Sequence, residues 1–558
     1  MSISPLLSRL LPFLRWPAPS RATLTADLVA GLTVVLLVVP QSLAYAQLAG
    51  VPAVYGLYAA FIPSVVGALF GSSVWLSTGP VALTSLLTAA SVVQFAHPGT
   101  EQFFASVTLL ALLSGVFQVL MGVFKAGILL NLLSRPVLSG FINAAAVVIT
   151  LSQLPTLLGI HPEQTGSIVK DTFYLVLNLP TLHPASTLLG LLSVGILLGL
   201  KRYAPKVPGV LVMVVIMTVV SERMDFGQGG GQIIGDIPKG LPDLIWPISD
   251  WHVAFTLIPA AFVIALVSFM EAMSSCKVMA IKTRTGWDEN QELIGQGLAK
   301  IVAAFCHSMP VSGSFSRSAL NLASGARSGY SSVFGGICIL LVLLYFTPLL
   351  YHLPKPALAA MIVMAVMNLI DFSSLKRAWA ASRDDGLAAL ITLGATLLLA
   401  PNIQLGILIG ISFSLAAFIY RRMFPKISIF SIGDAGELLE VTAASPAHEA
   451  NTVMVLRFDA ALIFANASFF EDAVRKIEHE HRRVQRIIVL ATGINLLDAS
   501  AVEMLKTLVM HLKENGIELA FVDAKQHFLD VAERTGLIQS ISSDNFYPSL
   551  QAALGVLK

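Results

Sequence analysis

Long apolar runs recur along most of this chain, and they limit what it can fold into. A helix needs about 20 mostly apolar residues to cross a bilayer. Runs of this kind predict fourteen membrane segments. They begin near Leu28, Tyr55, Val81, Phe103, Leu130, Leu188, Val207, Phe255, Leu293, Ser318, Ser331, Ala357, Leu387 and Leu405. The chain is therefore predicted to be an α-helical membrane protein embedded in a lipid bilayer.

Charge divides the chain into two parts. Only 12% of its 558 residues are charged, about half the usual share of a soluble protein. The charges concentrate after Glu437. This pattern predicts a cytosolic N-terminal segment over residues 1–24, a transmembrane domain over 25–425 and a soluble domain over 437–558. The net charge of +2 gives no support to nucleic-acid binding, which needs a strongly basic face, so no nucleic acid is predicted as a partner.

Lysine and arginine are distributed unevenly between the predicted loops. With the N-terminus inside the cell, the outer loops hold only Lys170, Arg223, Lys239 and Lys355, and the inner loops hold the rest. Cytoplasmic loops are enriched in these residues, so both termini are predicted to be cytoplasmic. The short loops and compact tail favour the inner (plasma) membrane as the location.

The third and tenth predicted segments are too short to cross alone. They follow stretches rich in glycine, serine and proline, Ser77–Pro80 and Pro310–Ser314. Interrupted segments in corresponding positions indicate a transporter built from an inverted repeat, with its ligand near the middle of the membrane. A half-helix that begins there directs the positive end of its dipole at the ligand. The pattern therefore favours an anion.

The tail alternates between strand and helix patterns. Strands are predicted at Val453–Phe458, Arg486–Leu490 and Ile517–Asp523, and helices at Ser500–Asn515 and Gln526–Thr535. This order indicates a small α/β domain.

Motifs for catalysis or cofactor binding do not stand out. The glycine run Gly229–Gly231 lacks the Lys and Ser or Thr that would complete a phosphate-binding loop. No nucleophile–base set or zinc pattern is evident either. We therefore predict no enzyme activity, no metal and no cofactor.

Several long motifs resemble the SulP family of anion transporters. They are Pro40–Tyr58, Ser77–Ala82, Asn290–Gly297 and Ser312–Ala319, in the family's order. The tail resembles the STAS domain that usually closes this family. The resemblance implies a seven-plus-seven inverted repeat with core and gate domains, a homodimer and an elevator-like movement of the core. It implies an anion held between the third and tenth half-helices, and it allows a cytosolic partner of the STAS domain.

The predicted anion site centres on Arg317, at the start of the tenth segment. A guanidinium keeps its charge when buried and therefore needs an anion or many hydrogen bonds. The resemblance matches Arg317 to the family's arginine beside the anion. Ser314 and Ser316 would add hydroxyl donors. Gln41 and Tyr45 stand four residues apart, share one helix face and would approach from the first segment.

The resemblance to the family implies roles for three further residues. Val81 and Phe315 would form walls of the anion site. Glu271 lies in the eighth segment, where the family carries an acidic residue. A carboxylate there must be paired or protonated, so it is predicted either to carry a proton during transport or to form a structural salt bridge with Arg317 or Lys277. Related transporters that use sodium tend to carry aspartate here with a nearby threonine. Because this chain has glutamate followed by Ser274 and Ser275, H⁺ is favoured over Na⁺ as the coupling ion.

Ser500 is a candidate regulatory residue in the tail. Soluble STAS relatives carry a phosphorylated serine at this strand-to-helix junction, usually followed by glycine, whereas alanine follows here. The alternative is that Ser500 only caps the helix.

The predicted function is secondary active transport of a small inorganic anion, with proton-coupled sulfate uptake first. The serine-rich run Ser312–Ser318 resembles sulfate-type more than bicarbonate-type members. Alternatives are a bicarbonate, C4-dicarboxylate or nucleobase-type transporter, a passive anion channel, or a membrane-tethered regulator that acts through its tail.

Overall fold

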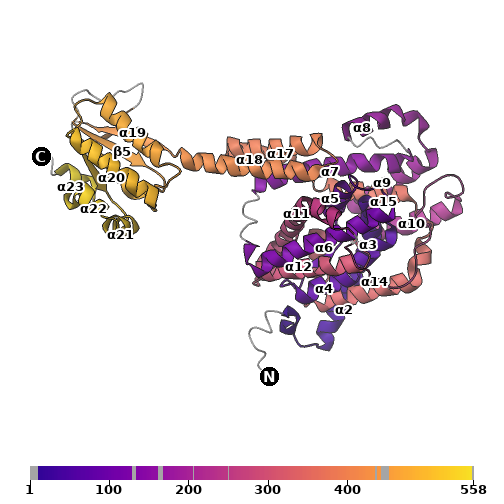
Figure 1. Cartoon of the computed structure of the whole chain (residues 1–558). Helices are drawn as coiled ribbons and strands as arrows, with labels where there is room; N and C mark the ends of the chain where they lie inside the picture. The colour runs from indigo at the N-terminus through magenta and orange to yellow at the C-terminus, as the bar shows by residue number, and fades with distance from the viewer. Residues whose placement is uncertain are drawn as a thin grey trace. The chain divides into compact units, whose positions relative to one another are not determined.

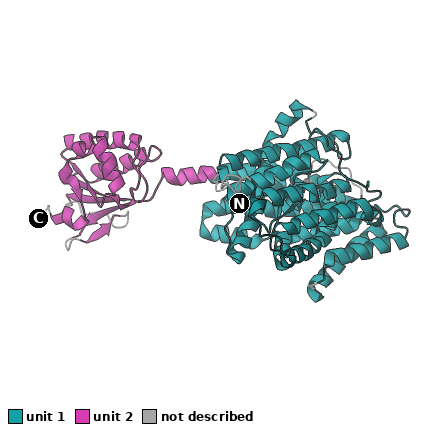
Figure 2. Cartoon of the chain, turned by 90° about the horizontal axis from the view of Figure 1, so that it is seen from below, with its two compact units in different colours: residues 1–414 teal, residues 415–558 magenta. Residues whose placement is uncertain are grey.

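The computed structural model describes residues 11–127, 134–160, 168–204, 207–248, 250–433, 437–441 and 452–555. The chain forms two compact units, Met1–Ser414 and Leu415–Lys558 (Figure 2). The division falls inside α18 (Ile403–Met423), so the end of the last long helix is grouped with the tail. The predicted start of one membrane segment, Leu130, lies outside the described residues.

Unit 1 is built almost entirely from helices (Figure 1). Before α18 they are η1 (Pro12–Arg15), α2 (Arg21–Ala49), α3 (Ala53–Ala60), α4 (Ile62–Phe70), α5 (Ala82–Val92), α6 (Glu101–Val123), α7 (Arg135–Leu158), α8 (Ile168–Leu177), η3 (Leu179–Thr181), α9 (Pro184–Tyr203), α10 (Gly209–Arg223), α11 (Trp251–Thr283), α12 (Glu289–Phe305), α13 (Phe315–Ala323), α14 (Tyr330–Leu341), η4 (Val342–Phe346), η5 (Thr347–Leu350), α15 (Lys355–Met367), α16 (Phe372–Ala381) and α17 (Arg383–Leu398).

These helices account for the apolar runs of the sequence, because each predicted run contains at least one of them. Within the described ranges, 9 helical stretches are long and apolar enough to cross a membrane by themselves. A membrane protein in which long apolar helices dominate is thus confirmed. The number of crossings, fourteen, stays a prediction.

Single residues explain where α2 begins and where it ends. The Ser20 hydroxyl accepts a hydrogen bond from the Thr23 backbone N–H at 3.1 Å and so caps the first turn. Gly50 ends the helix in the left-handed region, at φ 76°, which glycine adopts without steric cost.

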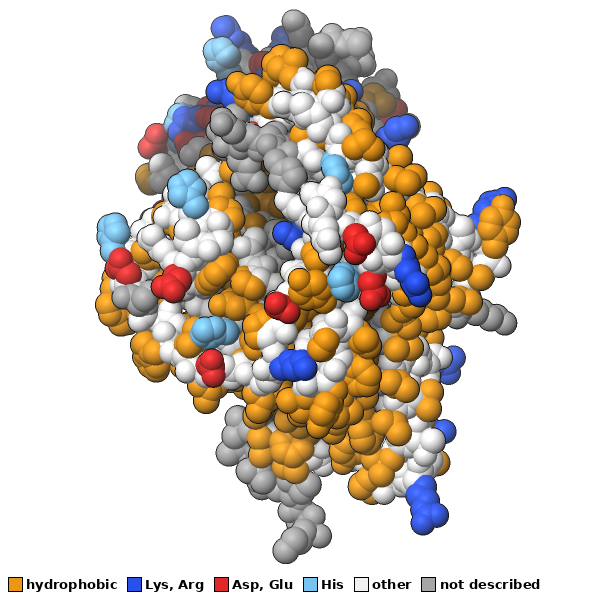
Figure 3. Space-filling model, turned by 90° about the vertical axis from the view of Figure 1, so that its right-hand side faces the viewer, with side chains coloured by type: hydrophobic (Ala, Val, Ile, Leu, Met, Phe, Trp, Pro, Cys, Tyr) orange, Lys and Arg blue, Asp and Glu red, His pale blue; other side chains and the backbone are white. Residues whose placement is uncertain are grey.

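Apolar side chains also cover much of the outside of unit 1. Figure 3 shows them over a broad part of one face. Exposed residues include Leu188 and Leu191 on α9, Phe255 on α11 and Leu398 on α17. In a soluble protein such a surface would aggregate, whereas in a bilayer it contacts lipid tails.

Unit 2 is a six-stranded sheet with helices on both faces. Its strands are β3 (Ile427–Ile432), β4 (Leu438–Glu440), β5 (Val453–Phe458), β6 (Arg486–Leu490), β7 (Glu518–Val522) and β8 (Phe546–Tyr547), in the order β4-β3-β5-β6-β7-β8. The pairs from β5 to β8 are parallel, and β3 pairs antiparallel with β4 and β5. Its helices are α19 (Ala467–Glu480), α20 (Ala499–Glu514), α21 (Gln526–Arg534), α22 (Leu537–Ile541) and α23 (Leu550–Gly555), with short turns η6 (Ala491–Gly493) and η7 (Ser543–Asn545).

Alternate residues of β5 explain the two layers of helices. Met454 and Leu456 are buried in one apolar cluster with residues of α19 and α20. Val455 is buried in another cluster with Ala553 of α23. Because successive side chains of a strand point to opposite faces, both faces need a cover. The predicted α/β tail is confirmed, and β3, β4 and β8 are additions that the sequence analysis missed.

Two glycines allow α6 and α12 to pack closely. A Cβ on Gly115 would lie 2.7 Å from the Gly297 carbonyl oxygen, and a Cβ on Gly297 would lie 2.7 Å from the Gly115 carbonyl oxygen. Small residues of this kind let helix backbones approach each other inside a membrane. This contact holds α12, which contains the Asn290–Gly297 motif, against α6.

We predict that Gly297→Ala lowers the melting temperature of the purified protein in detergent. The added methyl group must displace backbone, and overpacking costs about 1–3 kcal/mol, more than the roughly 1 kcal/mol that alanine gains in a helix. Gly195→Ala on α9 is the matched control, because nothing lies within 4 Å of its Cβ position. A Gly297→Ala protein as stable as this control would show that the close contact is unimportant.

Candidate functional site

Two short helices begin beside a two-stranded ribbon in unit 1. β1 (Ser77–Gly79) pairs antiparallel with β2 (Ser312–Ser314), with Ser77 opposite Ser314. α5 has 11 residues and α13 has 9. At 1.5 Å per residue they span about 16 Å and about 14 Å, roughly half of the ~30 Å hydrocarbon layer. The predicted interrupted segments are therefore confirmed as short helices.

The starts of both short helices are open. No side chain caps the first turn of α5 or of α13, both of which are described in full. The first N–H groups of a helix lack partners inside the helix and carry the positive end of its dipole. Each start can therefore donate hydrogen bonds to an anion.

Arg317 connects the two halves of this site. Its side chain is 1% exposed, and Nη1 donates a hydrogen bond to the Pro80 carbonyl oxygen at 2.8 Å. Among the described residues, Nε and Nη2 have no hydrogen-bond partner. A Cβ on Gly79, at φ +155°, would lie 3.2 Å from Nη2, so glycine leaves room beside the guanidinium. Two unused donors on a buried cation suit an anionic acceptor.

Gln41 and Tyr45 lie on the first long helix, α2, and α2 brings Tyr45 to this region. Pro40 lies inside α2 and has no N–H to donate, so the helical hydrogen-bond ladder is interrupted one residue before Gln41. Both side chains are buried, and Tyr45 interacts electrostatically with Arg317 and Glu271. The Gln41 Oε1 atom is buried without a partner among the described residues.

The other predicted contacts differ in their surroundings. Val81 is buried and immediately precedes α5. The Ser314 and Ser316 hydroxyls lie 3.4 Å apart at the start of α13, with Ser314 half-buried and Ser316 exposed. Phe315 is 50% exposed. These four residues flank the helix starts, and none of them forms a hydrogen bond with the Arg317 side chain in the described structure.

Glu271 lies on α11 with its Oε2 atom buried and without a hydrogen-bond partner among the described residues. Arg317 and Lys300 are the cations that act on its carboxyl group. No ion pair joins Glu271 to Arg317 or Lys277 within the described chain, and Lys277 is exposed. The geometry therefore does not provide the structural salt bridge that was the alternative for Glu271.

The sequence analysis missed Lys300, a fully buried lysine on α12. Its Nζ donates to the Gln118 Oε1 atom at 2.8 Å. Gln118 in turn donates to the Ser268 hydroxyl at 3.0 Å, one turn before Glu271 on α11. The signal was available, because a lysine in an apolar run is costly inside a membrane.

Two other buried carboxylates were also missed, and both are satisfied by donors. The Glu292 carboxylate accepts from the backbone N–H groups of Ser72 and Ser73 at 2.8 and 2.9 Å. The Asp27 carboxylate accepts from the backbone N–H groups of Arg327 and Ser328 at 2.6 and 3.1 Å. They fasten loops to helices, which is a structural role.

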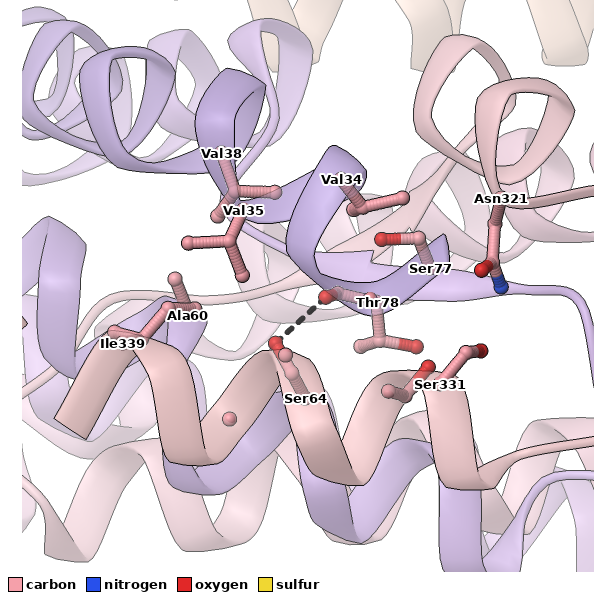
Figure 4. A pocket seen from close by; sticks show the side chains of 14 residues that line it. Val34, Val35, Val38, Ala60, Ser64, Ser77, Thr78, Asn321, Ser331 and Ile339 are labelled. Atoms are coloured by element: carbon pink, nitrogen blue, oxygen red, sulfur yellow. Dashed lines mark hydrogen bonds between the residues drawn. The ribbon is translucent and has the colours of Figure 1, made fainter. Parts of the chain in front are cut away.

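Residues Ser77 and Thr78 of β1 also line a small pocket (Figure 4). Val34, Val35 and Val38 of α2 line it together with the hydroxyl groups of Ser64 and Thr78. The Ser64 hydroxyl donates to the Thr78 carbonyl oxygen at 2.7 Å across it. None of the predicted site residues lines this pocket, so it is not the candidate anion site.

Ser500 lies in unit 2 as the second residue of α20 and is exposed. Asp498 caps this helix, because its carboxylate accepts from the Ala501 N–H at 2.9 Å. The interpretation of Ser500 as the helix cap is therefore wrong. In the described residues, no group of three or more His, Cys, Asp or Glu is placed to hold a metal ion.

The fold and the site define a multi-pass membrane transporter whose two half-helices start beside a buried arginine. Residues 24–392 match the model of the Sulfate permease family, and residues 445–553 match the STAS domain. This chain belongs to the sulfate permease family, which is a family of anion transporters and not of enzymes.

Named relatives span most of the chain. A probable sulfate transporter 4.2 of Arabidopsis thaliana is 34% identical over 549 residues, covering 95% of this chain and 80% of that protein. A probable sulfate transporter of Mycobacterium tuberculosis is 31% identical over 538 residues, covering 96% and 95%. The solved structure of the murine Solute Carrier 26 family member A9 anion transporter has a TM-score of 0.90 at 23% identity, covering 99% and 95%. This last likeness concerns the fold alone.

We predict that Arg317→Gln weakens sulfate binding to the purified protein by roughly 10- to 100-fold, because a hydrogen bond to a charged group contributes about 1.5–3 kcal/mol. Isothermal titration with sulfate measures the effect. Arg327→Gln is the control, since the Arg327 side chain is exposed. Equal affinity in the two variants would remove Arg317 from the anion site.

Proposed function

We propose that this protein takes up sulfate together with protons by an elevator-like movement of its core. The observation that carries the proposal is the pair of uncapped helix starts beside Arg317, a buried cation with two unused donor atoms. Helix dipoles and a full positive charge together favour an anion with more than one charge. Sulfate also appears in the names of both relatives described above.

We propose Glu271 as the group that carries a proton. Its buried Oε2 atom has no hydrogen-bond partner in the described structure, so this oxygen can take up a proton without breaking a hydrogen bond. Arg317 acts on it directly. Binding of an anion to Arg317 would weaken that interaction, and a weaker attraction favours protonation of the carboxylate. Anion binding and proton binding would thus assist each other, with Na⁺ coupling as the less favoured alternative.

We also propose the substrate contacts, the domain bounds, the oligomeric state and the location of the protein. Substrate contacts would come from Gln41, Tyr45, Val81, Ser314, Phe315, Ser316 and Arg317. The domains would be a cytosolic segment over 1–24, a fourteen-segment domain over 25–425 and the STAS domain over 437–558. The protein would be a homodimer in the inner (plasma) membrane with both termini in the cytoplasm, and its STAS domain would bind a cytosolic partner.

Uptake of radiolabelled sulfate into proteoliposomes tests this function. We expect accumulation only with an inward proton gradient, and weak competition from bicarbonate, succinate and fumarate. Flux of one of these competitors without sulfate uptake would overturn the substrate. Currents without coupled proton movement would indicate a channel.

We further predict that Glu271→Gln abolishes sulfate accumulation driven by a proton gradient but preserves exchange of internal for external sulfate. A glutamine has nearly the same shape and cannot exchange a proton. Glu222→Gln, at an exposed glutamate at the end of α10, is the control. Full proton-driven accumulation by Glu271→Gln would exclude Glu271 as the proton carrier.

We also propose Ser500 as a regulatory phosphorylation site. An added phosphate would lie at the start of α20, where the helix dipole favours negative charge, and its exposure permits modification. We expect Ser500→Glu to change the rate of sulfate uptake and Ser500→Ala to leave it at the wild-type value. Identical rates for both variants would argue against regulation at Ser500.

A further inference from the structure

Lys300 is a buried cation without a charged hydrogen-bond partner. It is 0% exposed, and of the described residues only the neutral Gln118 oxygen accepts a hydrogen bond from its Nζ. An ammonium group has three N–H donors, so two of them are unused. Burial under these conditions penalises the charged form of lysine, which, unlike arginine, can release its proton.

A chain of hydrogen bonds connects Lys300 to the anion site. Gln118 of α6 receives the Lys300 bond and donates to the Ser268 hydroxyl at 3.0 Å. The Ser312 hydroxyl of β2 donates to the Ser268 carbonyl oxygen at 2.7 Å. Ser268 precedes Glu271 by one turn of α11, and the Glu271 carboxyl group and the Lys300 amino group interact electrostatically.

The other charged groups around Lys300 are either satisfied or distant from its end of the helix. On α12 itself, Glu292 accepts four hydrogen bonds, from Ser72, Ser73 and Gln296. α4 contains no titratable residue, and in α6 the only one is the exposed Glu101 at its first turn. Glu271 of α11 is therefore the charged group that faces Lys300.

The net charge of the moving core requires a second proton-binding group besides Glu271. Moving net charge through the membrane interior is costly, so the core should carry the same charge when it crosses loaded and when it returns empty. Arg317 and the satisfied carboxylates Asp27 and Glu292 contribute equally to both crossings. A bound sulfate dianion adds two negative charges, so two protons must bind with it. Glu271 can accept only one of them.

We propose that Lys300 is the second proton carrier, so that each sulfate dianion crosses with two protons. In the loaded core, one proton neutralises the Glu271 carboxylate and the other converts the Lys300 amine to an ammonium group. On the far side sulfate leaves, both protons pass to water, and the core returns with an ionised Glu271 and a neutral Lys300. No covalent bond forms, and the cycle moves no net charge. This inference rests on the proposed function.

The proton-to-sulfate ratio of the wild-type protein tests it directly. Proteoliposomes hold a fixed proton gradient while valinomycin and potassium set the membrane potential. At one pH unit, two protons support an accumulation of about 100-fold and one proton about 10-fold, since each proton contributes a factor of ten. We expect about 100-fold accumulation that does not change with membrane potential. A ratio of one proton per sulfate would overturn the inference.

Two variants identify the residue. Lys300→Gln retains a hydrogen-bond donor for Gln118 but no exchangeable proton, and Lys300→Met removes both. In each variant, we expect the maximal sulfate accumulation at zero membrane potential to fall to about 10-fold per pH unit. We also expect an inside-negative potential to slow uptake, because one net negative charge then enters per cycle. Lys277→Met, at an exposed lysine of α11, should behave as wild type.

The possible failures can be told apart. Proton-driven uptake with two protons per sulfate in Lys300→Gln would exclude Lys300 while leaving the proposed function intact. Absence of proton-driven sulfate uptake in the wild-type protein would instead overturn the proposed function itself. If both variants fail to fold, the wild-type ratio still decides whether a second proton is carried.

Discussion

The structure depends on how backbone hydrogen bonds are satisfied where the chain stops being helical inside the membrane. The β1–β2 ribbon solves this problem by pairing two extended segments with each other, with Ser77 opposite Ser314. Further bonds complete the arrangement, such as the one from the Ser77 N–H to the Ser318 hydroxyl at 2.9 Å. With these groups paired, the starts of α5 and α13 remain as unsatisfied donors, and irregular backbone is tolerated there because it forms a site.

The buried charges of unit 1 fall into two groups when their hydrogen bonds are compared. Asp27 and Glu292 are surrounded by backbone and hydroxyl donors, and they fix loops in place. Arg317, Glu271 and Lys300 retain unused donor or acceptor positions although they are buried. Unsatisfied charge at membrane depth costs free energy, and we propose that substrate and protons supply the missing partners.

Several parts of the molecule could be predicted from local patterns. The strands Val453–Phe458 and Arg486–Leu490 have the predicted bounds, because short apolar runs between polar turns are a clear signal. β3 was missed because its short apolar run comes soon after the long apolar helix α18 and does not alternate strictly between apolar and polar residues. β8 has only two residues, Phe546 and Tyr547, and carries no pattern that a sequence alone could reveal.

The class of protein follows from the order of amino acids alone. Apolar runs, scarce charge and two interrupted segments require a membrane protein with broken helices, and the residues around Arg317 could be named because their motifs resemble those of a known transporter family. Which buried charges meet depends on how the helices pack. Glu271 interacts with Lys300, 29 positions away, and not with the nearby Lys277. The reason is that helix packing brings residues together that are far apart along the chain. Contacts such as that of Gly115 with Gly297 set this packing, and separation along the chain does not predict it.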